Sequence, residues 1–170
     1  MLLSVSAIYG LCLLVIGYRS LHAPGNRLQV GSRIKGKVVD VMNGNTFVVQ
    51  RHGRYILVRV SGLREPDSDS PWKVVASWAL VAKLQGRSVR VLVEDVHETG
   101  CIVGNVKLGK RDICREMIRE GHGRAMTSSP IVFSLLMIER EARKARVGLW
   151  ESSRPRASVL DRKSQDCRGK

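Results

Sequence analysis

The feature that most constrains the fold is a series of short β-type segments separated by tight-turn sequences. β-branched residues dominate 35–41 and 46–50, and Asn-Gly-Asn at 43–45 lies between them. A third segment of this kind, 54–61, follows the Arg-His-Gly sequence at 51–53. Apolar runs joined by such short turn sequences are typical of β-hairpins. The sequence therefore predicts a three-stranded antiparallel meander.

A helix is predicted directly after this meander. Pro71 suits the first turn of a helix, and Gly86 suits the position just past its end. The apolar residues between them recur at helical spacing, as expected of a helix that faces a core. These residues are Val74, Val75, Trp78, Val81 and Leu84.

Two more strands and two more helices complete the pattern. Segments 87–96 and 101–109 are predicted to be strands, and Gly104 indicates a bulge or a close approach between strands. Helices are predicted at 111–121 and within 128–150. The fold class that follows is α+β, mainly β. Its expected form is a five-stranded OB-type barrel with three α-helices packed at its side, preceded by an apolar N-terminal segment.

The expected organisation is one folded domain between two unlike ends. Residues 1–18 are apolar and uncharged, and 19–34 form a linker. Residues 35–150 form the domain, which is long enough to bury a core. Residues 151–170 mix Ser, Arg, Lys and Pro without periodicity, which is typical of a basic disordered tail.

The apolar segment 1–18 has the character of a signal anchor or a signal peptide. As a helix it would be about 27 Å long, barely enough to cross a bilayer. No Lys or Arg precedes it, and Ala23–Pro24 makes a poor cleavage site, so a retained membrane anchor is favoured. The protein is therefore expected to be membrane-anchored or exported to the envelope. The basic residues after the segment favour a cytoplasmic domain by the positive-inside rule, whereas export would place the domain on the other side. The sequence therefore leaves the side of the membrane open.

The charge balance favours anionic partners. The chain has a net formal charge of +14, and residues 33–150 alone hold 21 basic and 12 acidic residues, a difference of +9. Such a domain is expected to bind nucleic acid or another polyanion. Only 5% of the residues are aromatic, which argues against a broad platform for base stacking. No Cys or His cluster with metal-binding spacing is present in the sequence, so neither a structural zinc ion nor a small-molecule cofactor is expected.

Four stretches, taken in order and with their spacing, resemble the staphylococcal-nuclease-like (thermonuclease) family. They are "VMNGNTFVV" (41–49), "VRVSGLREPD" (58–67), "ETGCIVGNV" (98–106) and "EREARKARVGLW" (139–150). The resemblance covers about residues 35–150 and implies an OB barrel with three helices, in agreement with the pattern above.

The resemblance also implies where a catalytic site would lie. Active members hold Ca²⁺ with two aspartates and a backbone carbonyl, activate water with a glutamate, and bind the phosphate with two arginines. In this chain the two metal aspartates fall on Asn45 and Arg64, and the glutamate falls on the shorter Asp67. The first arginine is kept as Arg59, whereas the second falls on Cys101.

These exchanges predict a degenerate site. Arg64 places a permanent cation where a divalent ion would bind, so neither Ca²⁺ nor another metal is expected. Arg64 could pair with Asp67, and Glu65 is expected to point away from the site because neighbouring side chains alternate. No residue is assigned a catalytic role, and Arg59, Asp67 and Cys101 are interpreted as vestigial. Arg59 and Arg64 are predicted to bind anions.

Three functions remain open at this point. The favoured one is a domain without calcium-dependent nuclease activity that binds nucleic acid or another polyanion through its basic surface. The second is a calcium-dependent thermonuclease-type phosphodiesterase with an altered site. The third is an exported or membrane-anchored accessory protein of exopolysaccharide (succinoglycan-type) synthesis. The oligomeric state is not indicated by the sequence.

Overall fold

The structure, a computed structural model of the chain, describes residues 28–127 and 132–151. The predicted apolar segment 1–18 lies outside the described residues, as does all but the first residue of the predicted tail. No helix in the described ranges is long and apolar enough to cross a membrane.

The predicted meander is confirmed. β1 (Arg33–Val41), β2 (Thr46–Arg51) and β3 (Arg54–Val60) pair antiparallel in chain order. His52 and Gly53 have φ angles of 48° and 74°, so the loop between β2 and β3 is a two-residue turn with both residues left-handed. Such turns match the twist of the flanking strands, which is why a short sequence with glycine closes a hairpin here.

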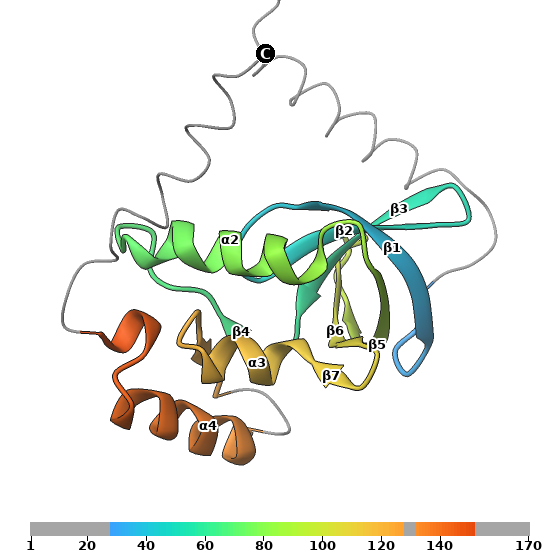
Figure 1. Cartoon of the computed structure of the whole chain (residues 1–170). Helices are drawn as coiled ribbons and strands as arrows, with labels where there is room; N and C mark the ends of the chain where they lie inside the picture. The colour runs from blue at the N-terminus through green and yellow to red at the C-terminus, as the bar shows by residue number, and fades with distance from the viewer. Residues whose placement is uncertain (1–27, 128–131, 152–170) are drawn as a thin grey trace, which may run out of the picture.

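Two further strands close the barrel. β5 (Ser88–Val96) pairs antiparallel with β1 and with β6 (Ile102–Leu108), and β6 runs parallel to β3 at the closing edge (Figure 1). The five-stranded OB-type barrel is therefore confirmed. The expected close approach at Gly104 is also present, because a Cβ there would overlap the Leu92 carbonyl oxygen and the Val91 side chain.

Three two-residue strands were not predicted. β4 (Leu63–Arg64) pairs with β8 (Arg124–Ala125) in a separate small sheet. β7 (Arg111–Asp112) pairs antiparallel with β6 at the edge of the main sheet. The β4–β8 pair joins the segment after the meander to the segment after the second predicted helix. It therefore brings Arg64 beside Arg124, which is 60 positions later in the chain.

The helices pack against one side of the barrel. α2 (Trp72–Leu84) lies across it, whereas α3 (Ile113–Arg119) and α4 (Val132–Lys144) lie together below β4, away from β1 and β5 (Figure 1). Val74 is 49% exposed, so its predicted core position is wrong. The core residues of α2 lie on a neighbouring part of the helix surface; they are Val75, Ala76, Leu80 and Leu84.

The last predicted helix is shorter than expected in its described part. α4 ends at Lys144, Arg146 has a left-handed φ of 50°, and a 3-10 turn, η1 (Gly148–Trp150), follows. Gly148 (φ 56°) packs directly on the backbone of Gly121, and the Leu149 N–H donates to the Gly121 carbonyl at 2.9 Å. This contact anchors the Gly-Leu-Trp sequence to the end of α3.

Candidate functional site

Asn45, at the first metal-aspartate position of the resemblance, lies in the turn that leads into β2. Its amide Nδ2 donates to the Leu63 carbonyl at 3.3 Å, and its Oδ1 accepts a hydrogen bond from Thr46 Oγ1 at 2.7 Å. Both ends of the amide are therefore engaged, and the side chain ties the start of β2 to β4. A neutral oxygen that already accepts a hydrogen bond is a poor substitute for a carboxylate ligand of a hard cation.

The turn next to Asn45 packs on α2. A Cβ at Gly44 would lie 2.9 Å from the Ala76 Cβ and 3.6 Å from the Glu65 Cβ, so a larger residue would not fit without a shift. Glu65 was expected to point away from the site, yet its Cβ lies against this turn. Its Oε2 is buried and has no hydrogen-bond partner among the described residues. No local sequence pattern signals this approach, because it depends on the long-range contact between the turn and β4.

Arg59 and Cys101, the two positions of the phosphate-binding arginines, lie close together. Arg59 is opposite Thr46 on β2 and opposite Val103 on β6, and its side chain is exposed. Cys101 is a free thiol at the start of β6 and only 6% exposed. Burial raises the pKa of this thiol, and the Arg59 charge opposes that shift only in part. The thiol is therefore neutral near pH 7, and Arg59 is the single cation of the pair.

Arg64 occupies the second metal-aspartate position on β4. It is exposed and lies directly opposite Arg124 of β8. The Asp67 carboxylate pairs with Arg124, from Nη1 to Oδ2 at 3.5 Å, and not with Arg64 as the sequence had indicated. Arg64 forms no ion pair with another described residue. The Arg124 guanidinium also lies 5.6 Å from the centre of the Trp150 ring, which connects the site to η1.

The described residues of this site do not fit a calcium ion. The Asp67 carboxylate already pairs with Arg124, Glu65 lies against the neighbouring turn, and the exposed cations Arg64 and Arg59 belong to β4 and β3. Nowhere in residues 28–127 and 132–151 do three His, Cys, Asp or Glu side chains converge as a metal site would require. Ca²⁺ takes six to eight oxygen ligands and gains affinity from charged ones, which is a larger set than these residues supply.

Comparison with known proteins places this chain in a family. Residues 57–152 match the family described as staphylococcal nuclease homologue, which is more than half of the chain. The chain belongs to the staphylococcal nuclease homologue family. The predicted family is thereby confirmed, and three of the four sequence stretches (58–67, 98–106 and 139–150) lie within the match.

The curated relatives of this family member include plant nucleases. The probable staphylococcal-like nuclease CAN2 of Oryza sativa subsp. japonica is 31% identical over 98 residues, which cover 58% of this chain and 27% of that protein. The staphylococcal-like nuclease CAN1 of Arabidopsis thaliana is 31% identical over 98 residues, covering 58% of this chain and 30% of that protein. This chain thus spans about a third or less of the length of these relatives.

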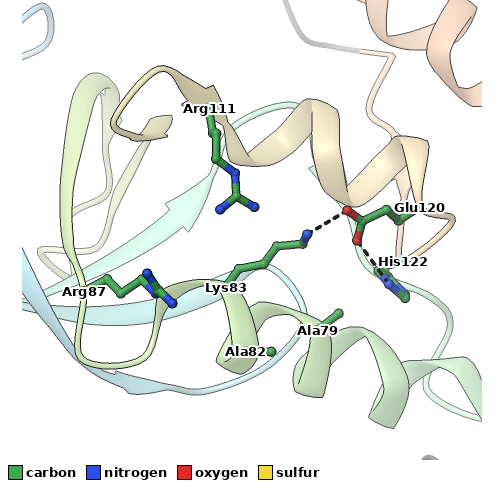
Figure 2. A pocket seen from close by; sticks show the side chains of 7 residues that line it. All are labelled: Ala79, Ala82, Lys83, Arg87, Arg111, Glu120 and His122. Atoms are coloured by element: carbon green, nitrogen blue, oxygen red, sulfur yellow. Dashed lines mark hydrogen bonds and ion pairs between the residues drawn. The ribbon is translucent and has the colours of Figure 1, made fainter.

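A charged pocket of about 230 Å³ lies between α2 and α3, apart from the family's site. Lys83 of α2 points at Glu120, with its Nζ 2.8 Å from Oε1 (Figure 2). The same Nζ lies 3.4 Å from Glu116 Oε2. Arg111 holds Glu116 with two hydrogen bonds of 2.7 and 2.6 Å, and His122 lies 3.5 Å from Glu120. Sequence analysis did not identify this cluster, since its members come from separate elements.

The ion pairs in this pocket balance one another. Lys83 and Arg111 are matched by Glu116 and Glu120, whereas Arg87, which also lines the pocket, adds one positive charge. Hydrogen bonding to Arg111 lowers the pKa of Glu116, and burial lowers the pKa of His122. The pocket therefore functions as a polar connection between α2 and α3.

Proposed function

We propose that this family member binds a polyanion, most simply single-stranded nucleic acid, and does not cut it with calcium. The observation that carries the proposal is the pair Asn45 and Arg64. An amide already engaged at both ends and an exposed guanidinium without an ion pair among the described residues stand at the two positions where the family's active members supply metal carboxylates. A surface cation at that point attracts a phosphate group and repels a divalent ion.

The remaining positions support binding without fast cleavage. Arg59 is exposed and can reach a phosphate, but Cys101 is a buried neutral thiol and cannot stabilise negative charge as it develops. Loss of one such donor typically slows an enzyme by about 10²–10³. Here the second arginine and both metal carboxylates are missing together.

The charge of the folded part and the names of the relatives favour nucleic acid as the polymer. Residues 33–150 hold 21 basic against 12 acidic residues. The plant proteins that resemble this chain are named as nucleases. Relatives named as nucleases are expected to bind nucleic acid. Contacts to its phosphate backbone alone would be enough to bind it to this chain.

The test uses the purified full-length protein and a labelled single-stranded DNA, with Ca²⁺ and with a chelator, scored for both binding and cutting. Binding is expected to weaken steeply as salt rises, with a slope near 0.7 per neutralised phosphate, and to be the same with or without Ca²⁺. Cutting that needs Ca²⁺ and stops with the chelator would overturn the proposal, as would no binding at low salt.

A matched pair of variants links the binding to the site. Arg59→Gln with Arg64→Gln should reduce both the affinity and the salt slope. Arg140→Gln with Lys144→Gln removes the same charge from the exposed face of α4 and should change the affinity much less. Equal losses in the two double variants would show that only net charge matters.

A further inference from the structure

A row of three cations crosses three neighbouring strands of the barrel. Lys35 of β1 is directly opposite Arg90 of β5, and Arg90 is directly opposite Lys107 of β6. The residues beside them in the strands, among them Ile34, Val91 and Val106, are buried in the core. Because side chains alternate along a strand, the three cations all lie on the outer face of the barrel, and all three are exposed.

This arrangement works against the stability of the sheet. Neighbouring strands are about 4.8 Å apart, so the row is roughly 10 Å long. Like charges directly opposite each other on one face of a sheet are destabilising. None of the three cations forms an ion pair with another described residue. Arg90 instead donates from Nη2 to the neutral Gly109 carbonyl at 2.6 Å, which fixes the guanidinium without neutralising it.

The nearest acidic residue in register is already engaged. Asp112 of β7 lies opposite Lys107. Its carboxylate caps α3, accepting from the Arg115 N–H at 3.1 Å, and also accepts from Asn105 Nδ2 at 3.3 Å. These bonds orient the Asp112 carboxylate without cancelling its charge, so the row of three cations ends at one negative charge on β7 and keeps a net charge of +2.

The same face extends the positive charge along β1. Arg33 and Lys37 lie two residues on either side of Lys35 and are exposed as well. Their partners across the strands are uncharged: Leu92 faces Arg33, and Ser88 and Gln50 face Lys37. Among the described residues no aromatic side chain is directly opposite one of these cations, and the exposed Tyr55 of β3 lies one strand further, opposite Gln50. The face therefore offers mainly contacts to charged groups.

We infer that the outer face of β1, β5 and β6 is a second binding site, built on Lys35, Arg90 and Lys107, for the phosphodiester backbone of a nucleic acid. The inference rests on the proposed function for the class of polymer. Contacts to phosphates alone would make binding at this face independent of base sequence. The repulsion that the row stores in the free protein is relieved when phosphates neutralise it.

β6 connects this face to the family's site. Val103 is the register partner of Arg59, and Val103 and Lys107 point to the same side of β6, four positions apart. At about 3.3 Å per residue the two positions are roughly 13 Å apart. An extended single strand that runs along β6 would therefore contact both Arg59 and the row.

The test compares two triple variants of the full-length protein that lose the same charge. Lys35→Gln, Arg90→Gln and Lys107→Gln remove the row, whereas Arg119→Gln, Arg140→Gln and Lys144→Gln remove exposed cations from α3 and α4. Binding of a labelled oligothymidylate and of a duplex of the same length is measured from low to moderate salt. The row variant should bind the single strand at least tenfold more weakly at low salt, with a salt slope smaller by about 2. The control variant should stay close to the wild type.

Thermal unfolding supplies an independent readout. The row variant should melt at the same temperature as the wild type or higher, because the opposed like charges are gone. Arg90→Lys keeps the charge and should keep the wild-type salt slope. A smaller slope for Arg90→Lys would contradict the inference even if the triple variant fails to fold.

The outcomes separate the two claims. If the wild type binds the oligonucleotides and the row variant binds equally well, the inference is wrong and the proposed function stands. If the wild type binds neither oligonucleotide, the proposed function fails. If the row variant loses binding to an acidic polysaccharide or to anionic vesicles while it keeps its affinity for both oligonucleotides, the inference about the ligand is wrong. Loss for the duplex as well as for the single strand would confirm recognition of the phosphate backbone in either form.

Discussion

Arg124 of β8 pairs with Asp67, Nη1 to Oδ2 at 3.5 Å, across the small sheet that also places Arg124 opposite Arg64. The one carboxylate kept from the family's catalytic set is therefore held by a cation from a distant part of the chain. Both partners are partly exposed, with side-chain exposures of 41% and 55%, so the pair contributes little to stability. Its consequence is local, because the Asp67 carboxylate lies beside a cation at the position where the resemblance places the water-activating glutamate.

The pocket between α2 and α3 predicts how stability depends on pH. Burial holds the pKa of His122 below its usual value, so the unfolded chain binds this proton more readily than the folded chain does. The contribution of His122 is therefore fully present above its unfolded pKa, near 6.5, and is lost as pH falls below that value. Thermal unfolding measured between pH 8 and pH 5 should show a falling melting temperature, and His122→Gln should flatten this part of the curve.

Glu116 predicts a second step at lower pH. Its hydrogen bonds with Arg111 hold its pKa below the usual value of 4.5, so its contribution is present above pH 4.5 and is lost as pH falls through the folded pKa. Glu116→Gln should remove that step and leave the His122 step in place. A melting temperature that stays constant from pH 8 to pH 5 would contradict the His122 assignment, and one that stays constant as pH falls below 4.5 would contradict the Glu116 assignment.

The barrel was predictable because its signals are local. Alternating residues in the long strands and short turn sequences between them decide the pairings of β1, β2 and β3, and the turn at His52–Gly53 has the geometry that such a sequence favours. Val74 was misplaced because spacing defines an apolar face of a helix only to within about one residue, and packing selects which part of it is buried.

The site was predictable only in part. The resemblance gave the positions of Asn45, Arg59 and Arg64, and the structure brings Asn45 to β4 as that pattern implies. Neither the approach of Arg124 to Asp67 nor the buried Oε2 of Glu65 could be read from the sequence. Both result from the two-residue strand β4, whose pairing has no local pattern to signal it.

The contact between Gly148 and Gly121 predicts that replacing Gly148 destabilises the protein more than replacing another left-handed glycine. Gly148→Ala forces an alanine into a left-handed conformation and drives its Cβ into the Gly121 carbonyl, so it should cost at least about 1–3 kcal/mol. Gly53→Ala is the matched control, since Gly53 is also left-handed but has no atom near its missing Cβ. Chemical denaturation should rank the variants in that order, and equal losses would show that the Gly121 contact adds nothing.

Residues 1–18 are proposed to hold the protein to a membrane. They contain no charged residue and are followed by basic residues, and the proline at position 24 disfavours cleavage after Ala23. The full-length protein should remain in the membrane fraction after alkaline washing. Mass spectrometry should show an N-terminus that still includes this segment. A soluble mature form that begins near residue 24 would show that the segment is a cleaved signal peptide.

Rebuilding the site step by step tests why it does not hold calcium. Arg64→Asp removes a cation and supplies a carboxylate, a change of two charge units, so it should produce measurable Ca²⁺ binding by calorimetry. Adding Asn45→Asp should increase the affinity further. It should also cost about 1–2 kcal/mol of stability, since a carboxylate would face the Leu63 carbonyl in place of the amide donor.

The rebuilt site should still differ from an active one in two respects that the structure identifies. Arg124 places a positive charge beside Asp67, so adding Arg124→Gln to the double variant should raise Ca²⁺ affinity again by removing local repulsion, whereas Arg140→Gln, which removes the same charge from α4, should not. Cleavage of denatured DNA should appear only when Asp67→Glu and Cys101→Arg are also present, because a neutral thiol cannot stabilise the phosphate in the transition state. Cys101 is buried, so the protein should tolerate Cys101→Arg only if the new side chain can reach the surface beside Arg59.

Arg59→Ala in the fully rebuilt protein should abolish cleavage and leave calcium binding intact. A loss of both would show that Arg59 supports the fold of the site and not its chemistry.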